Sequence, residues 1–310
     1  MKNTSNNEFN ENYDDEIYLS DLFKVLLNKK FLIAGITLIF TLVSILYALM
    51  LPNIYKSEAI MMPVETNSGM SAMLGQYSGM ASLAGISLDS KTTPKSKEAI
   101  ARIQSLEFFS NHILPFIALE DLLAVEKWDP ISNTVIYDKA IFNSGLNEWV
   151  QKTNPSKPTS QKAYETYKEI ISITENKSTS FISLSVVHKS PFIAQKWVEL
   201  VINQIDKSMR ERDKQDAIKA IEYLNSIVST VNYEELKNAL SSLQEEQMKQ
   251  LMMVEANENY IFKVLDSPVA PERKFEPRRS VIVVLGTFLG IIFGMLFALI
   301  MFYKNTLPAK

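Results

Sequence analysis

The chain has 310 residues, of which 46% are hydrophobic and 22% charged, with a formal net charge of -3. This near-neutral balance argues against a nucleic-acid binder, because neutralising phosphates needs a basic excess or a basic face. The absence of cysteine excludes disulfides, thiolate chemistry and cysteine-based zinc sites, although it does not fix the compartment. Length alone allows one large domain or two small ones.

Two uncharged segments predict helices that span a membrane. Residues 31–51 read FLIAGITLIFTLVSILYALML, and residues 281–303 read VIVVLGTFLGIIFGMLFALIMFY. Each has about the twenty residues that a helix needs to cross a hydrocarbon core of roughly 30 Å. A signal peptide is the alternative for the first segment. Its apolar core is too long for one, however, and LPNIY offers no small-residue cleavage site.

The charges beside the spans give the expected orientation. Two spans place both chain ends on one side, and Lys24, Lys29 and Lys30 assign that side to the cytoplasm. A basic cluster before the second span argues the opposite; its members are Arg273, Lys274, Arg278 and Arg279. We take the orientation from the charges beside the first span. The segment between the spans far exceeds the roughly 60 residues over which flanking charges act, so the basic cluster does not hold it in the cytoplasm.

This orientation divides the chain into five parts. We expect a cytoplasmic segment at residues 1–30 and a short cytoplasmic tail at residues 304–310. The two spans, residues 31–51 and 281–303, bracket a large domain at residues 52–280 on the other side of the membrane.

Strand-like and helical patterns alternate at the start of this domain. Residues 51–64 predict a short strand, and residues 65–90, rich in glycine, serine and methionine, predict a loop. Residues 96–114 have apolar side chains at helical spacing. Residues 170–188 predict two strands around a polar turn, and residues 260–268 predict a last strand returning to the membrane.

A long segment without helix breakers lies between Pro191 and Pro268. Neither proline nor glycine occurs inside it, which predicts one very long helix at about residues 192–258. Sixty helical residues would reach roughly 90 Å. The alternative is two helices broken near residues 229–232, where β-branched residues and asparagine cluster. The sequence RERDKQD, residues 210–216, is expected to be polar on every face of the helix.

An apolar seam follows the second half of this segment, with steps of four and three residues. The seam consists of Ala217, Ile221, Leu224, Val228 and Val231, and Leu236, Leu240 and Leu243 continue it. The small remainder of the chain cannot cover a narrow stripe on so long a helix. We therefore expect the seam to pack on other copies of the chain in a homo-oligomer.

Prolines and small residues mark the approach to the second span and the span itself. Pro268, Pro271 and Pro277 predict a stiff, extended connector. The span carries a glycine row at every fourth position, which consists of Gly286, Gly290, Gly294 and Ala298. Small residues at this spacing let helix backbones approach closely in lipid, although glycine is also simply common in membrane helices.

No catalytic constellation is present in the sequence. His112 and His188 are the only histidines, and structural roles are favoured for both. No glycine occurs between Gly145 and Gly286, which excludes a nucleotide-binding loop there. We expect no enzyme activity, no cofactor and no metal site.

These parts, in this order, resemble the chain-length determinant (Wzz) family of bacterial polysaccharide co-polymerases. The resemblance rests on DDEIYLSDLFKVLLNKK, LPNIYKSEAIMMP, FISLSVVHKSPFIAQKWVELVINQI and VAPERKFEPRRSVIVVLGTFLGIIFG. It implies an α+β periplasmic domain built from segments at both of its ends, a long helix rising from it, two flanking spans in the inner membrane, and ring-shaped homo-oligomers.

The resemblance also implies a role without chemistry: setting the modal length of O-antigen or a related glycan made by a separate polymerase on a lipid carrier. The basic cluster would then contact lipid headgroups or the pyrophosphate of the glycan. Two alternatives remain, which are an adaptor for a separate capsule tyrosine kinase and a two-span sensor or tether. Some relatives carry such a kinase after the second span, whereas only about seven residues follow Tyr303 here.

Overall fold

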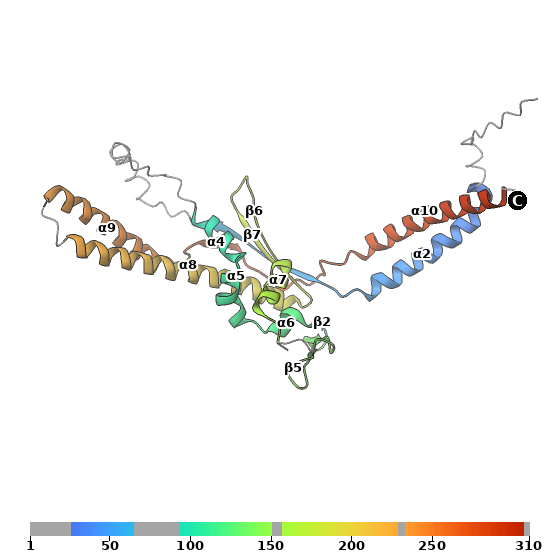
Figure 1. The fold of residues 1–310 in the computed structure, drawn as a ribbon, viewed down its shortest axis with the longest axis horizontal. Coiled ribbons are helices and arrows are strands. Elements are labelled where there is room, and N and C mark those ends of the chain that lie inside the picture. Colours follow the sequence, from blue (N-terminus) through green and yellow to red (C-terminus); the bar gives the residue numbers. More distant parts are fainter. Residues whose placement is uncertain (1–25, 65–93, 151–156, 229–232, 307–310) are drawn as a thin grey trace, which may run out of the picture. The chain divides into compact units, whose positions relative to one another are not determined.

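The structure of the chain is a computed structural model (Figure 1). It separates into two units, one made from the two ends of the chain and the other from residues 52–276. The structure describes residues 26–64, 94–150, 157–228 and 233–306. The expected loop at 65–90 and most of the segment at 1–30 lie outside the described residues.

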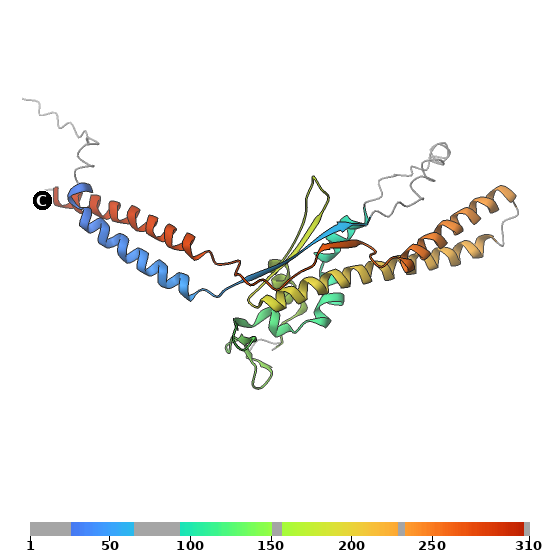
Figure 2. The same cartoon turned by 180° about the vertical axis from the view of Figure 1, so that it is seen from behind.

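The first unit is a pair of helices, α2 (Lys30–Met50) and α10 (Arg279–Thr306), which pack side by side (Figures 1 and 2). Both are long and apolar enough to cross a membrane. Helix α2 ends where it does because proline at position 52 forces the preceding residue, Leu51, into the extended conformation observed there. The two spans of the predicted fold class are therefore helices at the expected places.

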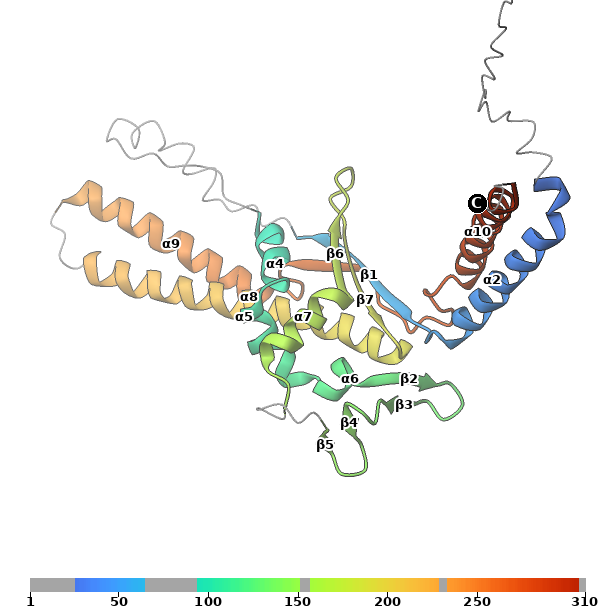
Figure 3. The ribbon, with the colours of Figure 1, turned by 45° about the vertical axis from the view of Figure 1, so that its right-hand side comes forward.

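The second unit is built on a four-stranded antiparallel sheet, visible in Figure 3. Its strands lie in the order β6 (Ile171–Glu175), β7 (Ile182–His188), β1 (Tyr55–Pro63) and β8 (Phe262–Asp266). The strands predicted within 51–64, 170–188 and 260–268 are thus confirmed. Strand β1 follows the first helix and β8 precedes the last, so segments from both ends of the unit pair with each other.

Alternation along the strands separates a buried face of the sheet from an exposed one. In β7, Ile182, Leu184 and Val186 are buried, and they pair in register with Met61, Ala59 and Ser57 of β1. The buried face packs against α8 (Pro191–Val228), which contacts both strands. This half-buried pattern is the one expected of an antiparallel sheet covered by helices on one side.

Two helices occupy the segment between Pro191 and Pro268. Helix α8 has 38 residues, and α9 (Glu234–Ala256) folds back against it (Figure 3). The prediction of a very long helix holds for α8, about 57 Å by its residue count. The prediction of one continuous helix to about residue 258 is wrong. The alternative break near 229–232 is the arrangement found, and these four residues lie outside the described ones.

Helix α9 covers part of the seam, which was expected to pack only on other copies of the chain. Ala217 is 1% exposed, as is Val254 of α9, and Nε2 of Gln244 donates to Oδ1 of Asn225 across the pair at 2.9 Å. Ile221, Leu224 and Val228 are half-buried, and Val231 lies outside the described residues. We call α8 and α9 together the helical hairpin. The hairpin buries part of the seam within one chain, so only the remaining part of the seam is available to other copies.

Shorter elements complete the second unit. The helix predicted at 96–114 is interrupted after α4 (Lys95–Ile103), because the hydroxyl of Ser105 accepts the amide of Phe108 and starts a new turn. The continuation comprises α5 (Leu106–Phe108), a π-helix (Phe109–Ile113) and a 3-10 turn (Leu114–Phe116). The remaining elements are α6 (Leu119–Leu123), β2 (Val125–Asp129), β3 (Thr134–Tyr137), β4 (Phe142–Asn143), β5 (Glu148–Trp149) and α7 (Ser160–Ile170).

Candidate functional site

The glycine row of α10 lies against α2 of the same chain. A Cβ built on Gly290 would stand 2.8 Å from Cβ of Phe40 and 3.0 Å from Cα of Thr37. One built on Gly294 would stand 3.2 Å from Cα of Ile33. These separations from backbone atoms are shorter than side chains normally tolerate. Only residues without a Cβ allow the two helices to approach this closely.

Polar and aromatic contacts also join the two helices. The hydroxyls of Thr41 and Thr287 lie 3.0 Å apart, and the rings of Phe40 and Phe293 stack with centroids separated by 5.4 Å. In hydrocarbon, packing and interhelical hydrogen bonds supply most of the association between helices. The partner of the glycine row in this structure is therefore α2, whereas the sequence alone left the identity of the neighbouring helix open.

The proline connector is held against the first strand of the sheet. Pro268 is buried, and the hydroxyl of Ser57 donates to the carbonyl of Val269 at 2.8 Å. Further along, the amide of Ile54 donates to the carbonyl of Glu276 at 2.9 Å. Pro271 is half-buried. The connector therefore follows the start of β1 as an extended segment up to residue 276, and Pro277 begins the other unit.

The basic cluster surrounds Pro277 in the sequence. Arg273, Lys274 and Arg278 are exposed, and Arg279 is the first residue of α10. Exposed guanidinium and ammonium groups are suited to phosphate, which guanidinium binds through two parallel hydrogen bonds.

A buried polar cluster, which the sequence analysis missed, joins α8 to α4 and to the segment before β8. We define it as Lys95, Asp206, Arg210, Arg212, Asp213 and Tyr260. Asp213 is only 5% exposed, and its carboxylate accepts from Nζ of Lys95 at 2.6 Å and from the hydroxyl of Tyr260 at 2.6 Å. Arg212 adds a third contact at 3.0 Å.

Arg210 and Asp206 of this cluster fix the end of α9. The guanidinium of Arg210 donates to the carbonyl of Val254, in the last turn of α9 where helix carbonyls lack partners within the helix, and to those of Asn257 and Glu258 just after it. Asp206 accepts the amides of Tyr260 and Ile261, each at 3.0 Å. The segment RERDKQD is polar on every face, as expected, but Arg210, Arg212 and Asp213 face other parts of the chain and anchor the hairpin of α8 and α9.

Both histidines have structural environments. The amide of Ser190 donates to Nδ1 of His188 at 2.9 Å, so Nε2 carries the proton and donates to the carbonyl of Asp121 at 2.9 Å. Burial lowers the pKa of His188, which is 7% exposed. His112 contacts the hydroxyl of Ser208 at 3.2 Å, and burial lowers its pKa as well. Within the described ranges, no three His, Asp or Glu side chains are grouped to hold a metal.

The lowered pKa of His188 predicts a loss of stability in mild acid. In the unfolded chain its pKa is about 6.5, so below that pH the unfolded state binds a proton that the folded state excludes. We expect the Tm of the wild type to fall more steeply between pH 7 and pH 5 than the Tm of His188→Gln. Thermal unfolding of the full chain in detergent, followed by circular dichroism, measures both slopes.

The matched control is His112→Gln. Its side chain is less buried than that of His188, so this variant should keep most of the slope of the wild type. Equal slopes for the wild type and His188→Gln would contradict the assignment of a neutral, buried imidazole.

Comparison with known proteins shows that two parts of the chain are similar to known families. The family model described as "Chain length determinant protein" (Wzz) matches residues 15–112. A second model, "G-rich domain on putative tyrosine kinase" (GNVR), matches residues 227–301. The first match confirms the resemblance found in the sequence: residues 15–112 are similar to the Wzz chain length determinant family.

Two solved structures align with the chain at low identity. A full-length bacterial polysaccharide co-polymerase is 13% identical, with 94% of this chain and 100% of that chain covered and a TM-score of 0.42. A fragment of WzzB, a polysaccharide co-polymerase from Salmonella Typhimurium, is 14% identical, with 72% and 100% covered and a TM-score of 0.26. The search of curated proteins gave no match.

Proposed function

We propose that this chain is a polysaccharide co-polymerase, which controls the length of a surface polysaccharide without catalysing its synthesis. More specifically, it sets the modal length of O-antigen or a related glycan that a separate polymerase makes. The observation that carries this proposal is the Wzz family match over residues 15–112. Two further observations support it. Two helices able to span a membrane flank the domain in the sequence, and the first and last strands of that domain pair with each other.

The proposal includes an orientation in the bacterial inner membrane. Both chain ends lie in the cytoplasm and residues 52–276 lie in the periplasm. Lys29 and Lys30 at the start of α2 support this arrangement. The basic cluster then lies at the periplasmic surface, where it contacts phosphate groups of lipid headgroups or of the lipid-linked glycan.

The proposal also includes a ring-shaped homo-oligomer and contact with the polymerase. Because α2 covers the glycine row and α9 covers part of the seam, neither surface is wholly free for these partners. Exposed apolar side chains elsewhere on the helical hairpin are better candidates for contacts between copies. They include Ile218, Tyr223, Met248 and Met252.

Deleting the gene is expected to change the length distribution of one surface polysaccharide from a modal cluster to an unregulated ladder. Gel electrophoresis of the extracted polysaccharide measures this, and expression of the wild-type chain should restore the cluster. Arg278→Glu, which replaces a phosphate-binding cation with an anion, should restore it less well than Lys304→Glu, a charge reversal at the other end of α10. An unchanged distribution after deletion would overturn the proposal.

A membrane adaptor for a tyrosine kinase is the second candidate, and the GNVR match over residues 227–301 favours it. An adaptor would change the phosphotyrosine content of a separate kinase on deletion. Genes for a polymerase and a flippase beside this one would favour length control, whereas a kinase gene there would favour the adaptor.

A further inference from the structure

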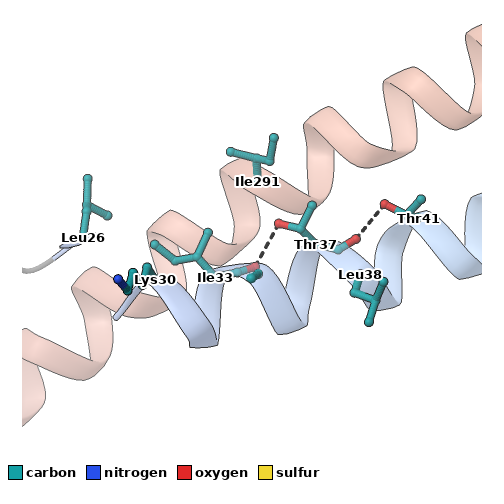
Figure 4. A pocket seen from close by; sticks show the side chains of 8 residues that line it. Leu26, Lys30, Ile33, Thr37, Leu38, Thr41 and Ile291 are labelled. Atoms are coloured by element: carbon teal, nitrogen blue, oxygen red, sulfur yellow. Dashed lines mark hydrogen bonds between the residues drawn. The ribbon is translucent and has the colours of Figure 1, made fainter. Parts of the chain in front are cut away.

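A groove of about 470 Å³ runs along the helix pair of the first unit (Figure 4). From α2, Lys30, Ala34, Thr37 and Thr41 line it, and they recur at steps of three or four residues on one face of the helix. Ile291 of α10 lines it from the neighbouring helix.

The polar atoms inside the groove are already satisfied. The hydroxyl of Thr37 donates to the carbonyl of Ile33 at 2.9 Å, and that of Thr41 donates to the carbonyl of Thr37 at 2.8 Å (Figure 4). The hydroxyl of Thr37 turns back onto its own helix and that of Thr41 also contacts Thr287 of α10, so neither needs a partner from an occupant. What the groove offers an occupant is mainly methyl and methylene surface, which suits a hydrocarbon chain and does not hold water.

Lys30, the cation among the residues that line the groove, lies at one end of this apolar surface. Lys30 is exposed, and in the described part of the chain its ammonium group contacts the ring of Phe31, at 5.4 Å, and no carboxylate. The eleven residue steps from Lys30 to Thr41 correspond to about 16 Å of helix. That length is about half of a hydrocarbon core of roughly 30 Å, which is the depth of one leaflet.

We infer that this groove binds one acyl chain of an anionic phospholipid, with the lipid phosphate paired to the ammonium group of Lys30. The charge at the mouth selects an anionic headgroup, and the length of the groove matches a chain that ends at the bilayer midplane. A polyprenyl chain, which is several times longer, would overrun it. The inference goes beyond the proposed function and does not depend on it.

Native mass spectrometry of the full chain in detergent, titrated with phosphatidylglycerol, tests the fit of the acyl chain. Ala34 is exposed within the groove, so Ala34→Phe should fill it and reduce the bound lipid severalfold. The matched control is Gly35→Phe, one position along the helix. A Cβ at Gly35 meets nothing within 4 Å, so this variant should bind as the wild type does.

The same titration tests the headgroup through charge. Lys30→Gln should reduce the preference for phosphatidylglycerol over phosphatidylcholine by about fivefold, the value of one lysine near an anionic surface. Lys304→Gln removes an equal charge from the exposed C-terminal end of α10, which does not line the groove, and should reduce the preference less than Lys30→Gln does. Because the Lys30 side chain is exposed, its loss does not disturb the packing of the helices.

Three results would overturn the inference. In the first, Ala34→Phe and Gly35→Phe bind phosphatidylglycerol equally, or Lys30→Gln and Lys304→Gln keep the same preference. In the second, Ala34→Phe lowers the oligomer mass while lipid binding is unchanged, which would assign the groove to a helix of a second copy. In the third, undecaprenyl phosphate displaces phosphatidylglycerol at equal concentration, which would assign the groove to the glycan carrier.

Discussion

Replacing Asp213 with alanine is expected to reduce the free energy of unfolding of residues 52–276 by about 3 kcal/mol. Removing one partner of a buried ion pair costs about 3 to 5 kcal/mol, because the remaining charge stays buried without compensation. We take the lower end, since Lys95 and Arg212 keep 29% and 34% of their side-chain surface exposed. For a unit of this size, the loss corresponds to a decrease in Tm of about 6 to 12 °C.

Thermal unfolding of the full chain in detergent measures this decrease, and Asp216→Ala is the matched control. Asp216 lies one turn away on the same helix. Its side chain is 65% exposed, and its contact with Nε of Arg212 is long, at 4.0 Å. An exposed ion pair of this kind contributes about 0 to 1 kcal/mol. Similar decreases in Tm for the two variants would show that the buried polar cluster does not anchor the helical hairpin.

Acid titration gives an independent check on Asp213. Burial by itself raises the pKa of Asp213, but the hydrogen bonds from Lys95 and Tyr260 outweigh it and hold the pKa below its ordinary value. The stabilisation is therefore present above the unfolded pKa of about 3.9 and is lost as the pH falls through the folded value. The difference in Tm between the wild type and Asp213→Asn should be constant near pH 6 to 7 and shrink below about pH 4.

Replacing Gly290 with leucine is expected to separate α10 from α2. The new Cβ would stand 3.0 Å from Cα of Thr37, a backbone atom that cannot rotate away, and the rest of the side chain needs still more room. Loss of close packing and of the hydrogen bond between Thr41 and Thr287 removes about 1 to 2 kcal/mol, which shifts a marginal helix pair several-fold.

Cross-linking measures the separation cleanly, because the chain has no cysteine of its own. Thr41→Cys together with Thr287→Cys places two thiols where the hydroxyls lie 3.0 Å apart. A disulfide should form readily in this background and several-fold less in the presence of Gly290→Leu. Gly35→Leu, on the open side of α2, should leave the yield unchanged. Equal yields in the two leucine variants would mean that the glycine row is ordinary membrane-helix composition.

If the helix pair is needed for length control, Gly290→Leu should also shift the glycan distribution toward that of the deletion strain at normal protein abundance. A wild-type distribution combined with a lost cross-link would separate the two questions, because the packing would then be confirmed and its role in length control refuted.

Local patterns predicted the elements whose environment is set by near neighbours. The two spans follow from uncharged runs of the length of a bilayer, and β7 follows from the alternation of Ile182, Leu184 and Val186 with serine. The short hairpins between residues 125 and 149 carried no comparable pattern. Two of these strands have only two residues each, too few for any periodicity to register.

Features that depend on distant partners were missed or left open. Nothing in RERDKQD distinguishes Asp213, which is buried, from Asp216, which is exposed, because the difference comes from Lys95 and Tyr260 elsewhere in the chain. Likewise, the absence of proline and glycine allowed one continuous helix. The free energy gained by packing α9 on α8 favours two helices, and helix propensity alone does not include that gain.

The pairing of β1 with β8 imposes an order of events on synthesis of the chain. Ile60 is paired with Asp266, about 200 residues later. At roughly 5 to 20 residues per second, the ribosome needs about 10 to 40 s to deliver the second strand after the first. Throughout that interval one edge of β1 has no partner strand. Side chains that are buried in the folded unit, such as Met61, also lack the part of the core that Phe262 later supplies. Before that strand is delivered, the nascent chain exposes an unpaired strand edge, a form that is prone to aggregate.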